Sequence, residues 1–486
     1  MLLKSEKEFI KFAIQVNNIM KIDQIYTGCL AQGAYYIESQ GQVAIIDPLR
    51  EVQPYIDKAE QNNAQIKYIF ETHFHADFVS GHVTLAEKTG ASIIFGPTAS
   101  PSFKAHIAKD DEVFQLGDLT ITALHTPGHT MESTTYLLKD KNGKDYAIFS
   151  GDTLFLGDVG RPDLAQKAAH MTQEQLAGLL YDSLRTKIMP LADEVIVYPA
   201  HGAGSACGKN LSKETVGTIG DQKATNYALR ANMTKEEFVQ EVTNGLLPPP
   251  AYFPMNVKMN KEGYQNVENI IKEAQAYDPK TFELIANDTD ALILDVRHQD
   301  DFAKGHIPKS IFIGLDGGFA PWVGALILDY KQPILLVTQE GRENETITRL
   351  ARVGYDNTIG YLKGGFDAWK KAGYEYDTVT TVEATALEQK MKDNVPVFDV
   401  RKPGEYASEH VLDVPSTPLD FLNEHLAEFP KEENFYVHCA GGYRSMIAAS
   451  ILKARGYHNV IDVKGGYAAI KNTGIKRTAY VCPSTL

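Results

Sequence analysis

The chain has 486 residues and a formal net charge of −14 at pH 7, with 43% hydrophobic and 23% charged residues. This length corresponds to about three domains of ordinary globular composition, and the acidic charge argues against a nucleic-acid-binding protein, whose binding surface is basic. Four widely spaced cysteines argue against a disulfide scaffold and favour a reducing, cytoplasmic location. The N-terminal segment shows no secretory leader, and no apolar run is long enough to cross a membrane.

Residues 1–245 form the first predicted domain, in which short β-rich runs alternate with helical stretches from residue 22 onward. Each predicted strand runs into a loop that carries His, Asp or Gly, and polar side chains at strand ends are where α/β proteins place their chemistry. The predicted strands lie in residues 42–48, 67–73, 91–97, 119–125, 145–152 and 194–202.

A proline-rich segment, residues 246–268, follows this domain. Pro248, Pro249 and Pro250 lack backbone donors and have a fixed φ, so no regular element continues through them. We therefore predict a linker here. Its apolar and aromatic side chains predict that it packs against a domain surface.

An internal repeat occupies the rest of the chain. Asp-Val-Arg occurs at 295–297 and again at 399–401, each time after a β-rich run. Two further pairs follow in the same order, PILLVTQEGRENE with FYVHCAGGYRS and YLKGGFDAWKKAGY with DVKGGYAAIKNTG. Three matched features in one order predict two copies of one α/β domain, at 269–377 and 378–486.

Four motifs in the first domain carry side chains that bind metals: THFHADF, TPGHT, SGDTLF and PAHG. Imidazoles and carboxylates that converge from the rigid ends of strands can form a metal site. A single His-x-His pair is weak evidence, but all four motifs in this order predict a metal centre. The candidate residues are His73, His75, Asp77, His129, Asp152 and His201.

This order of motifs resembles the metallo-β-lactamase superfamily over residues 22–245, which implies an αββα sandwich. The usual pattern of that superfamily, His-x-His-x-Asp-His, can bind two metals, but Phe78 stands where the last histidine is expected. Phenylalanine cannot coordinate a metal, so this departure favours a mononuclear centre. Asp77 and His201 are then expected to support the ligands or orient the substrate.

Within the superfamily, the persulfide dioxygenase branch resembles this chain best, and the run GDTLFLGDVGRPDL at 151–164 is similar to that branch. The resemblance implies one Fe(II) per chain, held by His73, His129 and Asp152. Two histidines and one carboxylate are the ligand set of non-haem iron oxygenases, which leave positions open for O₂ and substrate. His75 is expected beside the ligands rather than among them.

The same resemblance places further residues near the substrate. Arg161 and Asp163 would lie at the substrate entrance, with a purely local salt bridge as the alternative. Tyr198 would lie beside the reacting sulfur or the oxygen. The segment that follows His201 resembles bacterial fusions of a persulfide dioxygenase with rhodanese domains. On its Gly-rich loop, Cys207 either reacts with persulfide or is a small buried thiol.

Cys439 follows a predicted strand of the second repeat and opens the loop CAGGYRS. The backbone N–H groups of such a loop, the start of the next helix and the charge of Arg444 favour a thiolate, which accepts sulfane sulfur as Cys–S–SH. The loop resembles the rhodanese active site, which implies a parallel central sheet in both repeats. In the first repeat Gln339 aligns with Cys439, so we predict that this copy does not transfer sulfur and serves as a spacer, an interface or a channel wall.

Together these resemblances imply an enzyme of sulfide detoxification. A low-molecular-weight thiol persulfide, carried on glutathione, coenzyme A or bacillithiol, would react with O₂ at the iron to give sulfite and thiol. Cys439 would interconvert sulfite, persulfide and thiosulfate, in a direction that the sequence leaves open. Relatives suggest a homodimer or homotetramer, without nucleic-acid or membrane partners.

Two other functions are kept as alternatives. One is a glyoxalase-II-like thioester hydrolase with two zinc ions, against which Phe78 and the rhodanese repeats argue. The other is a non-catalytic sulfur-relay scaffold, which only the degenerate first repeat supports. The intact metal motifs and Cys439 argue against a scaffold.

Overall fold

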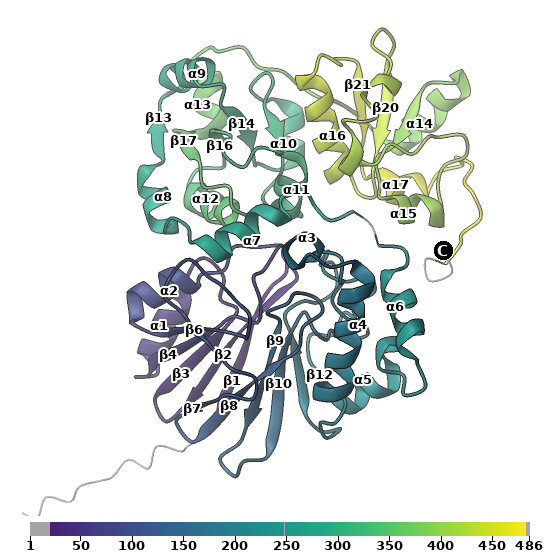
Figure 1. Cartoon of the computed structure of the whole chain (residues 1–486). Helices are drawn as coiled ribbons and strands as arrows, with labels where there is room; N and C mark the ends of the chain where they lie inside the picture. The colour runs from purple at the N-terminus through teal and green to yellow at the C-terminus, as the bar shows by residue number, and fades with distance from the viewer. Residues whose placement is uncertain (1–19, 247, 483–486) are drawn as a thin grey trace, which may run out of the picture.

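The computed structural model describes residues 20–246 and 248–482, which form the three domains in Figure 1. The predicted absence of a secretory leader falls mainly on residues 1–19 and so lies outside the described residues. Among the helices of the described ranges, none combines the length and the apolar composition needed to cross a membrane.

The first domain begins with a six-stranded sheet. Its strands are β1 (Lys21–Thr27), β2 (Gln32–Ser39), β3 (Gln42–Ile46), β4 (Gln65–Phe70), β5 (Ser92–Phe95) and β6 (His106–Ile107). They are paired in chain order, antiparallel from β1 to β3 and parallel from β3 to β6. Two helices, α1 (Gln53–Gln61) and α2 (His82–Thr89), cover one face of this sheet.

A second six-stranded sheet packs against the first. Its strands are β7 (Val113–Leu116), β8 (Leu119–His125), β9 (Thr134–Lys139), β10 (Asp145–Gly151), β11 (Ile196–Pro199) and β12 (Gly217–Thr218). All neighbouring pairs are antiparallel except β10 and β11. The helices of this half are α3 (Gln166–Ala169), α4 (Gln173–Ser183), α5 (Ile219–Thr225) and α6 (Lys235–Thr243).

The alternation of side chains along the strands builds the layers of this domain. In β2, Tyr35 and Ile37 face the second sheet and share a core with Phe149. Tyr36 faces the other way and packs with Tyr55 of α1. On the far side, the second sheet packs on α4, α5 and α6. The predicted αββα sandwich is therefore confirmed.

The segment between the first and second domains is helical over much of its length. It contains α7 (Phe253–Glu262) and α8 (Val267–Glu273). Pro254 lies in the first turn of α7, where a missing backbone donor costs no hydrogen bond. Asn256 and Asn260 on the same helix are buried, so the segment predicted as a linker forms a packed connection.

Both repeats form parallel sheets. The first contains β13 (Gln275–Tyr277), β14 (Leu292–Asp295), β15 (Ile311–Phe312), β16 (Ile334–Val337) and β17 (Thr358–Leu362), in the order β13-β17-β16-β14-β15. The second contains β18 (Thr380–Val382), β19 (Val397–Asp399), β20 (Phe435–His438) and β21 (Val460–Val463), in the order β18-β21-β20-β19. These sheets confirm the predicted fold class of the repeats.

Helices flank both parallel sheets (Figure 1). The first repeat has α9 (Pro279–Asp288), α10 (Gln299–Lys304), α11 (Phe319–Leu326), α12 (Glu343–Ala351) and α13 (Gly365–Lys371). The second has α14 (Ala384–Lys390), α15 (Pro403–Ser408), α16 (Tyr443–Ala454) and α17 (Gly466–Ile470).

The repeated Asp-Val-Arg motif has the same structural role in both copies. Arg297 is 2.6 Å from Asp295, and Arg401 is 2.6 Å from Asp399, each pair at the end of a strand. Each arginine also donates a 2.8 Å hydrogen bond to the carbonyl eight residues ahead. The motif thus ties the strand end to the loop after the next helix, which explains its recurrence without a catalytic role.

Arg50 joins the first domain to the first repeat. Its side chain is fully buried and forms a bidentate pair with Asp356, at 2.7 and 2.6 Å. It also donates to the carbonyls of Ala351 and Gln265. Close by, Arg352 of the first repeat pairs with Glu51. Both terminal nitrogens of this buried guanidinium are hydrogen-bonded across the boundary, which fixes how the two domains sit.

Candidate functional site

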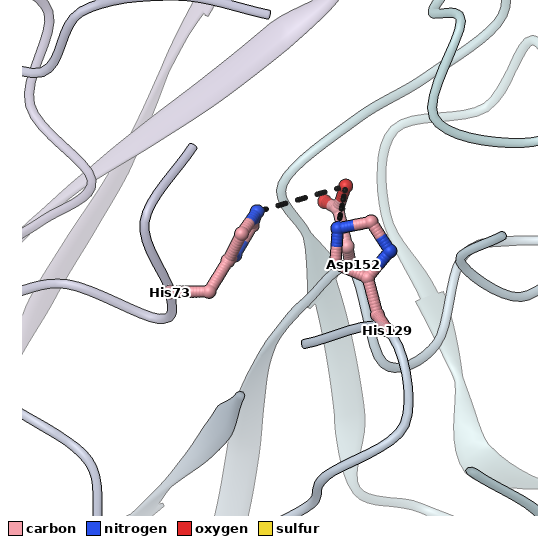
Figure 2. A group of neighbouring side chains, drawn as sticks. All are labelled: His73, His129 and Asp152. Carbon is pink, nitrogen blue, oxygen red and sulfur yellow. Dashed lines mark ion pairs between the residues drawn. The ribbon is translucent and has the colours of Figure 1, made fainter. Parts of the chain in front are cut away.

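Three buried side chains of the predicted metal motifs meet at one edge of the sandwich. The Nε2 atoms of His73 and His129 lie 3.9 and 3.5 Å from Oδ2 of Asp152. One donor atom from each residue falls within 4.8 Å of the other two. Figure 2 shows both imidazoles close to the Asp152 carboxylate.

Strand ends bring these residues together. His73 follows β4, and Asp152 directly follows β10. Gly151 has φ +54°, and a Cβ there would approach Thr72 to 2.6 Å. A glycine is therefore needed where the ends of the two strands come close.

Hydrogen bonds orient both imidazoles with Nε2 toward the centre. His129 donates from Nδ1 to the carbonyl of Arg161 at 2.9 Å. The Thr72 hydroxyl donates to Asp47 at 2.8 Å, so at 3.0 Å it accepts from Nδ1 of His73. Such partners fix the tautomer of a metal-binding histidine.

The donor set has the protonation and the free atoms that a metal requires. His73 Nε2 and Asp152 Oδ2 are buried and have no hydrogen-bond partner among the described residues. Burial, together with the nearby His75, holds the pKa of His73 well below its usual value. Burial alone would raise the pKa of Asp152, but His201 and His73 lower it overall. Neutral imidazoles and an ionised carboxylate are metal donors, so these residues fit a metal ion.

A second buried group, Asp77, His201 and Cys207, lies directly behind the first. His201 bridges two carboxylates, with Nδ1 2.8 Å from Asp152 and Nε2 2.8 Å from Asp77. Burial acts to lower the pKa of His201, but these carboxylates outweigh it and raise that pKa well above its usual value. Burial, with the charges of Asp77 and Asp152, raises the pKa of the Cys207 thiol.

His75 turns away from the three central donors. Its Nε2 lies 3.0 Å from Asp47 and 3.5 Å from Glu71. The ring of Phe78 packs on it at 4.4 Å and is fully buried. The position expected for a last histidine is therefore filled by an apolar ring in the core.

The three residues assigned near the substrate have different surroundings. Arg161 and Asp163 form a bidentate pair at 2.7 Å, which matches the local alternative, and the Arg161 carbonyl holds His129. Tyr198 is not brought to the three donors by its described contacts. Its ring stacks on Phe149 at 5.3 Å and packs on Tyr35 in the core between the sheets, because its position in β11 faces that core.

Sequence reasoning missed two residues that support the site. Asp47 accepts from both the amide and the hydroxyl of Thr72 at 2.8 Å, and its place at the end of a predicted strand was a usable signal. Asn260 of α7 donates to the carbonyls of His75 and Phe78 and accepts from the Ser80 amide, all at 2.8 Å. No motif marks an asparagine that lies 180 to 185 residues from the positions that it holds.

The Cys439 loop forms the second centre. The amide of Gly442 donates to the sulfur of Cys439 at 3.1 Å, with φ +102° at that glycine. A Cβ on Gly466 would come within 2.3 Å of the Cys439 carbonyl. The terminal Gly-Gly motif thus lets α17 pack directly on this loop. Tyr467 and Ala468 then donate to the carbonyls of Cys439 and Ala440.

Arg444 lies in the same loop but forms a bidentate pair with Glu405, at 2.5 and 2.8 Å. Its charge is therefore shared with a carboxylate rather than directed at Cys439 alone. Tyr443, its neighbour, donates to the carbonyl of Gly314 in the first repeat at 2.7 Å. The first repeat therefore supports the loop that carries Cys439.

The alignment of Gln339 with Cys439 is wrong by one residue. Asp295 pairs with Val337 in the first sheet, and Asp399 pairs with His438 in the second. Thr338 therefore occupies the place of Cys439, because the loop before α12 is one residue longer than the loop before α16. Threonine, like glutamine, has no thiol, so the first repeat still lacks a sulfur carrier.

Comparisons with known proteins agree with this arrangement. The sequence model of the metallo-beta-lactamase superfamily matches residues 27–201, and that of the rhodanese-like domain matches residues 278–372 and 383–473. A solved structure, the metallo-beta-lactamase from Staphylococcus aureus subsp. aureus COL, is 31% identical with a TM-score of 0.63. The match covers 71% of this chain and 99% of that one.

The names of the curated relatives refer to two different activities. The cytoplasmic hydroxyacylglutathione hydrolase of Arabidopsis thaliana is 32% identical over 37% of this chain and 67% of its own length. The mitochondrial persulfide dioxygenase ETHE1 of Homo sapiens is 27% identical over 45% of this chain and 78% of its own length. A probable hydroxyacylglutathione hydrolase of Schizosaccharomyces pombe is 30% identical, and the chain spans 60% of its length.

Proposed function

We propose that this chain, which belongs to the metallo-beta-lactamase superfamily and carries two rhodanese-like domains, has persulfide dioxygenase activity. Its architecture fits a fusion of a persulfide dioxygenase with rhodanese domains. In this proposal the first domain oxidises a thiol persulfide with O₂ to sulfite and thiol. The second rhodanese-like domain transfers sulfane sulfur through Cys439.

One observation carries the proposal. Two imidazoles and one carboxylate, from His73, His129 and Asp152, converge as one donor set, while Phe78 fills the place of a further histidine, which favours a mononuclear centre. This is the donor set of non-haem Fe(II) oxygenases. The cysteine loop in the same chain also supports the proposal, because oxidation at the metal and sulfur transfer at Cys439 both act on the outer sulfur of a persulfide.

The first reaction balances as R–S–SH + O₂ + H₂O → R–SH + SO₃²⁻ + 2H⁺. A bound ferrous ion would supply the open coordination positions and the redox chemistry that O₂ requires. The chain contributes orientation: hydrogen bonds at Nδ1 direct the Nε2 atoms of His73 and His129 toward the centre. The His201 ring lies between Asp152 and Asp77, and its Nδ1 fixes the direction of the Asp152 carboxylate.

The second reaction takes place at Cys439. The thiolate attacks the outer sulfur of R–S–SH, the donor S–S bond breaks, the thiol R–SH leaves, and Cys–S–SH remains. Sulfite then attacks that outer sulfur, which leaves as thiosulfate and returns the electron pair of the broken bond to Cys439. The Gly442 amide, 3.1 Å from the sulfur, stabilises the thiolate at both stages.

The test is persulfide-dependent O₂ uptake by the full-length, iron-loaded protein. We expect uptake with at least one of the persulfides of glutathione, coenzyme A and bacillithiol, with sulfite and thiosulfate as products. If none of the three supports O₂ uptake, the proposal is wrong.

A thioester hydrolase is the second candidate, because hydroxyacylglutathione hydrolases are among the relatives. Such an enzyme in this superfamily would use two zinc ions. Metal analysis separates the two: one iron per chain supports the dioxygenase. Two zinc ions per chain, with hydrolysis of a glutathione thioester, would support the hydrolase.

A further inference from the structure

A cavity of about 730 Å³ lies where the three domains meet. The first domain lines it with Cys29, Asp77 and the loop at 203–206, the first repeat with Trp322 and its neighbours, and the second repeat with Arg444 and its neighbours. A volume of this size is typical of sites that hold a small molecule. Since no single domain encloses it, the cavity exists only in the intact chain.

The cavity borders residues that adjoin both centres. Asp77 in its wall is 2.8 Å from His201, which is 2.8 Å from Asp152 of the metal donor set. On the opposite side, Arg444 belongs to the loop that carries Cys439. A molecule in this space would therefore contact Asp77, which supports the metal donors through His201, on one side and Arg444 of the cysteine loop on the other.

The first repeat is held tightly as one wall of this cavity. A Cβ on Gly317 would come within 2.3 Å of the Tyr443 ring in the cysteine loop. A Cβ on Gly324 of α11 would come equally close to Tyr252, which precedes α7. These glycines allow residues 317–324 to pack closely against both the interdomain segment and the second repeat, and Trp322 of α11 lines the cavity.

All charged side chains that line the cavity form ion pairs, except one lysine and one aspartate. Asp77 is paired with His201, and Asp316, Arg349 and Arg444 also have partners of opposite charge. Lys402 and Asp420, both from the second repeat, form no ion pair within the described part of the chain. Both side chains are exposed and line the cavity, and an ammonium and a carboxylate without ion pairs, in a wall that also contains the Trp322 indole, suit a ligand that carries both charges.

We propose that this cavity binds the carrier half of the thiol persulfide and presents its sulfur to both centres. The carrier is a thiol of amino-acid type, whose carboxylate binds Lys402, whose ammonium binds Asp420 and whose body lies on Trp322. The first repeat, which lacks a cysteine, thus serves substrate recognition. This inference rests on the proposed function for its substrate, and it concerns residues outside the first domain.

The test compares two persulfides with the iron-loaded, full-length protein: glutathione persulfide, which carries both charges, and 2-mercaptoethanol persulfide, which carries neither on its carrier. Lys402→Ala should raise KM for O₂ uptake about tenfold with glutathione persulfide, since a charge-assisted hydrogen bond is lost. We expect kcat to change less than about twofold, and both constants to be unchanged with 2-mercaptoethanol persulfide. The matched control is Lys476→Ala, an exposed lysine of the same repeat that does not line the cavity.

An unchanged KM for O₂ uptake in Lys402→Ala would overturn the shared cavity, even if sulfur transfer at Cys439 were slower. A preference for coenzyme A persulfide over glutathione persulfide would overturn the assignment of the carrier. Calorimetric binding of reduced glutathione gives a second readout, independent of O₂. If the protein takes up no O₂, Lys402→Ala and Asp420→Asn should still each weaken glutathione binding about tenfold, and equal binding by all variants would refute the cavity as a carrier site.

Discussion

At the residue scale, the orientation of two imidazoles determines what the first centre can do. His73 and His129 are each fixed through Nδ1, by a hydroxyl and by a backbone carbonyl. Both Nε2 atoms are available to bind a metal because of these bonds at Nδ1, and not because of the ligand motif alone. The Thr72 hydroxyl and the carbonyl of Arg161 therefore orient the two imidazoles of the site.

Replacing His129 with alanine should empty the metal site. The change removes one of three donors, and the remaining His73 and Asp152 cannot complete the set. We expect metal content to fall by more than about tenfold, as measured by elemental analysis. His106→Ala, which alters an exposed histidine, is the control. Metal retained at wild-type occupancy in His129→Ala would refute the ligand assignment.

Cys439→Ser should abolish sulfur transfer but leave O₂ uptake in place. The serine hydroxyl keeps the shape of the loop and cannot form a persulfide. We expect thiosulfate formation to disappear and sulfite to accumulate, as measured by chromatography of both anions. Cys482→Ser, at an exposed cysteine, is the control. Loss of both activities in Cys439→Ser would show that the two centres are not separable.

Residue identities in motifs could be predicted, but their partners could not. The metal motifs indicated His73, His129 and Asp152 because their chemistry and order are specific. The pairing of Arg444 with Glu405 and the stacking of Tyr198 in the core depend on contacts distant in sequence. The alignment of Gln339 failed because a one-residue difference in loop length leaves no signal in a sequence pair.

At the scale of elements, α7 of the interdomain segment binds the loop at residues 75–80, which follows the metal motif of the first domain. Asn260 satisfies three backbone groups of residues 75–80 from a fully buried position. Buried backbone groups that lose their partners destabilise the fold. The helix therefore holds the loop that carries His73 and His75.

Asn260→Ala should lower the free energy of unfolding by roughly 2–4 kcal/mol, because it leaves buried donors and acceptors unpaired. Asn256→Ala on the same helix is the matched control. Asn256 is equally buried, but its side-chain amide has no partner among the described residues, so we expect a smaller loss. Denaturant unfolding measures both. Equal losses would show that Asn260 contributes packing rather than hydrogen bonds.

Asp462 on β21 should make the second repeat less stable as pH rises. Burial raises the pKa of Asp462 to about 7, above its usual value of 3.8. The folded state therefore favours the neutral acid. Its stabilising effect is fully present below pH 4 and is lost progressively as pH rises from about 4 to 7.

Asp462→Asn should remove this dependence and raise stability at pH 8 by a few kcal/mol. Thermal unfolding between pH 5 and pH 8 measures the change, with Asp393→Asn, at an exposed position, as the control. If Asp462→Asn falls in stability with pH as steeply as the wild type, burial does not perturb this group.

Elements with a strong pattern could be predicted from the sequence. The six predicted strands of the first domain all appear, because their continuous apolar runs fit a buried sheet. The short strands β6 and β12 carry too few residues for a pattern. Helix α7 follows three prolines, and its buried face contains asparagines, which apolar periodicity does not reveal.

At the scale of the whole molecule, the three domains act as one unit. Arg50 anchors the first domain to the first repeat, and Tyr443 anchors the first repeat to the cysteine loop. The order of the domains could be predicted from motifs. Their arrangement could not, because these contacts join residues 306 and 129 positions apart.

Asp356→Ala should destabilise the boundary between the first domain and the first repeat. It leaves the fully buried Arg50 without its ionic partner, which costs roughly 3–5 kcal/mol. We expect a lower first transition in thermal unfolding. Glu194→Ala, which breaks an exposed pair with Lys144, should cost no more than about 1 kcal/mol. Equal effects of the two changes would contradict the anchoring role of Arg50.

The central claim is that one chain oxidises a thiol persulfide at a single iron. Its most direct test measures persulfide-dependent O₂ uptake by full-length protein loaded to increasing iron content. The account predicts uptake that rises in proportion to iron, reaches its maximum at one iron per chain and yields sulfite or thiosulfate. Iron-saturated protein that consumes no O₂ with any thiol persulfide, while zinc-loaded protein hydrolyses a glutathione thioester, would contradict it.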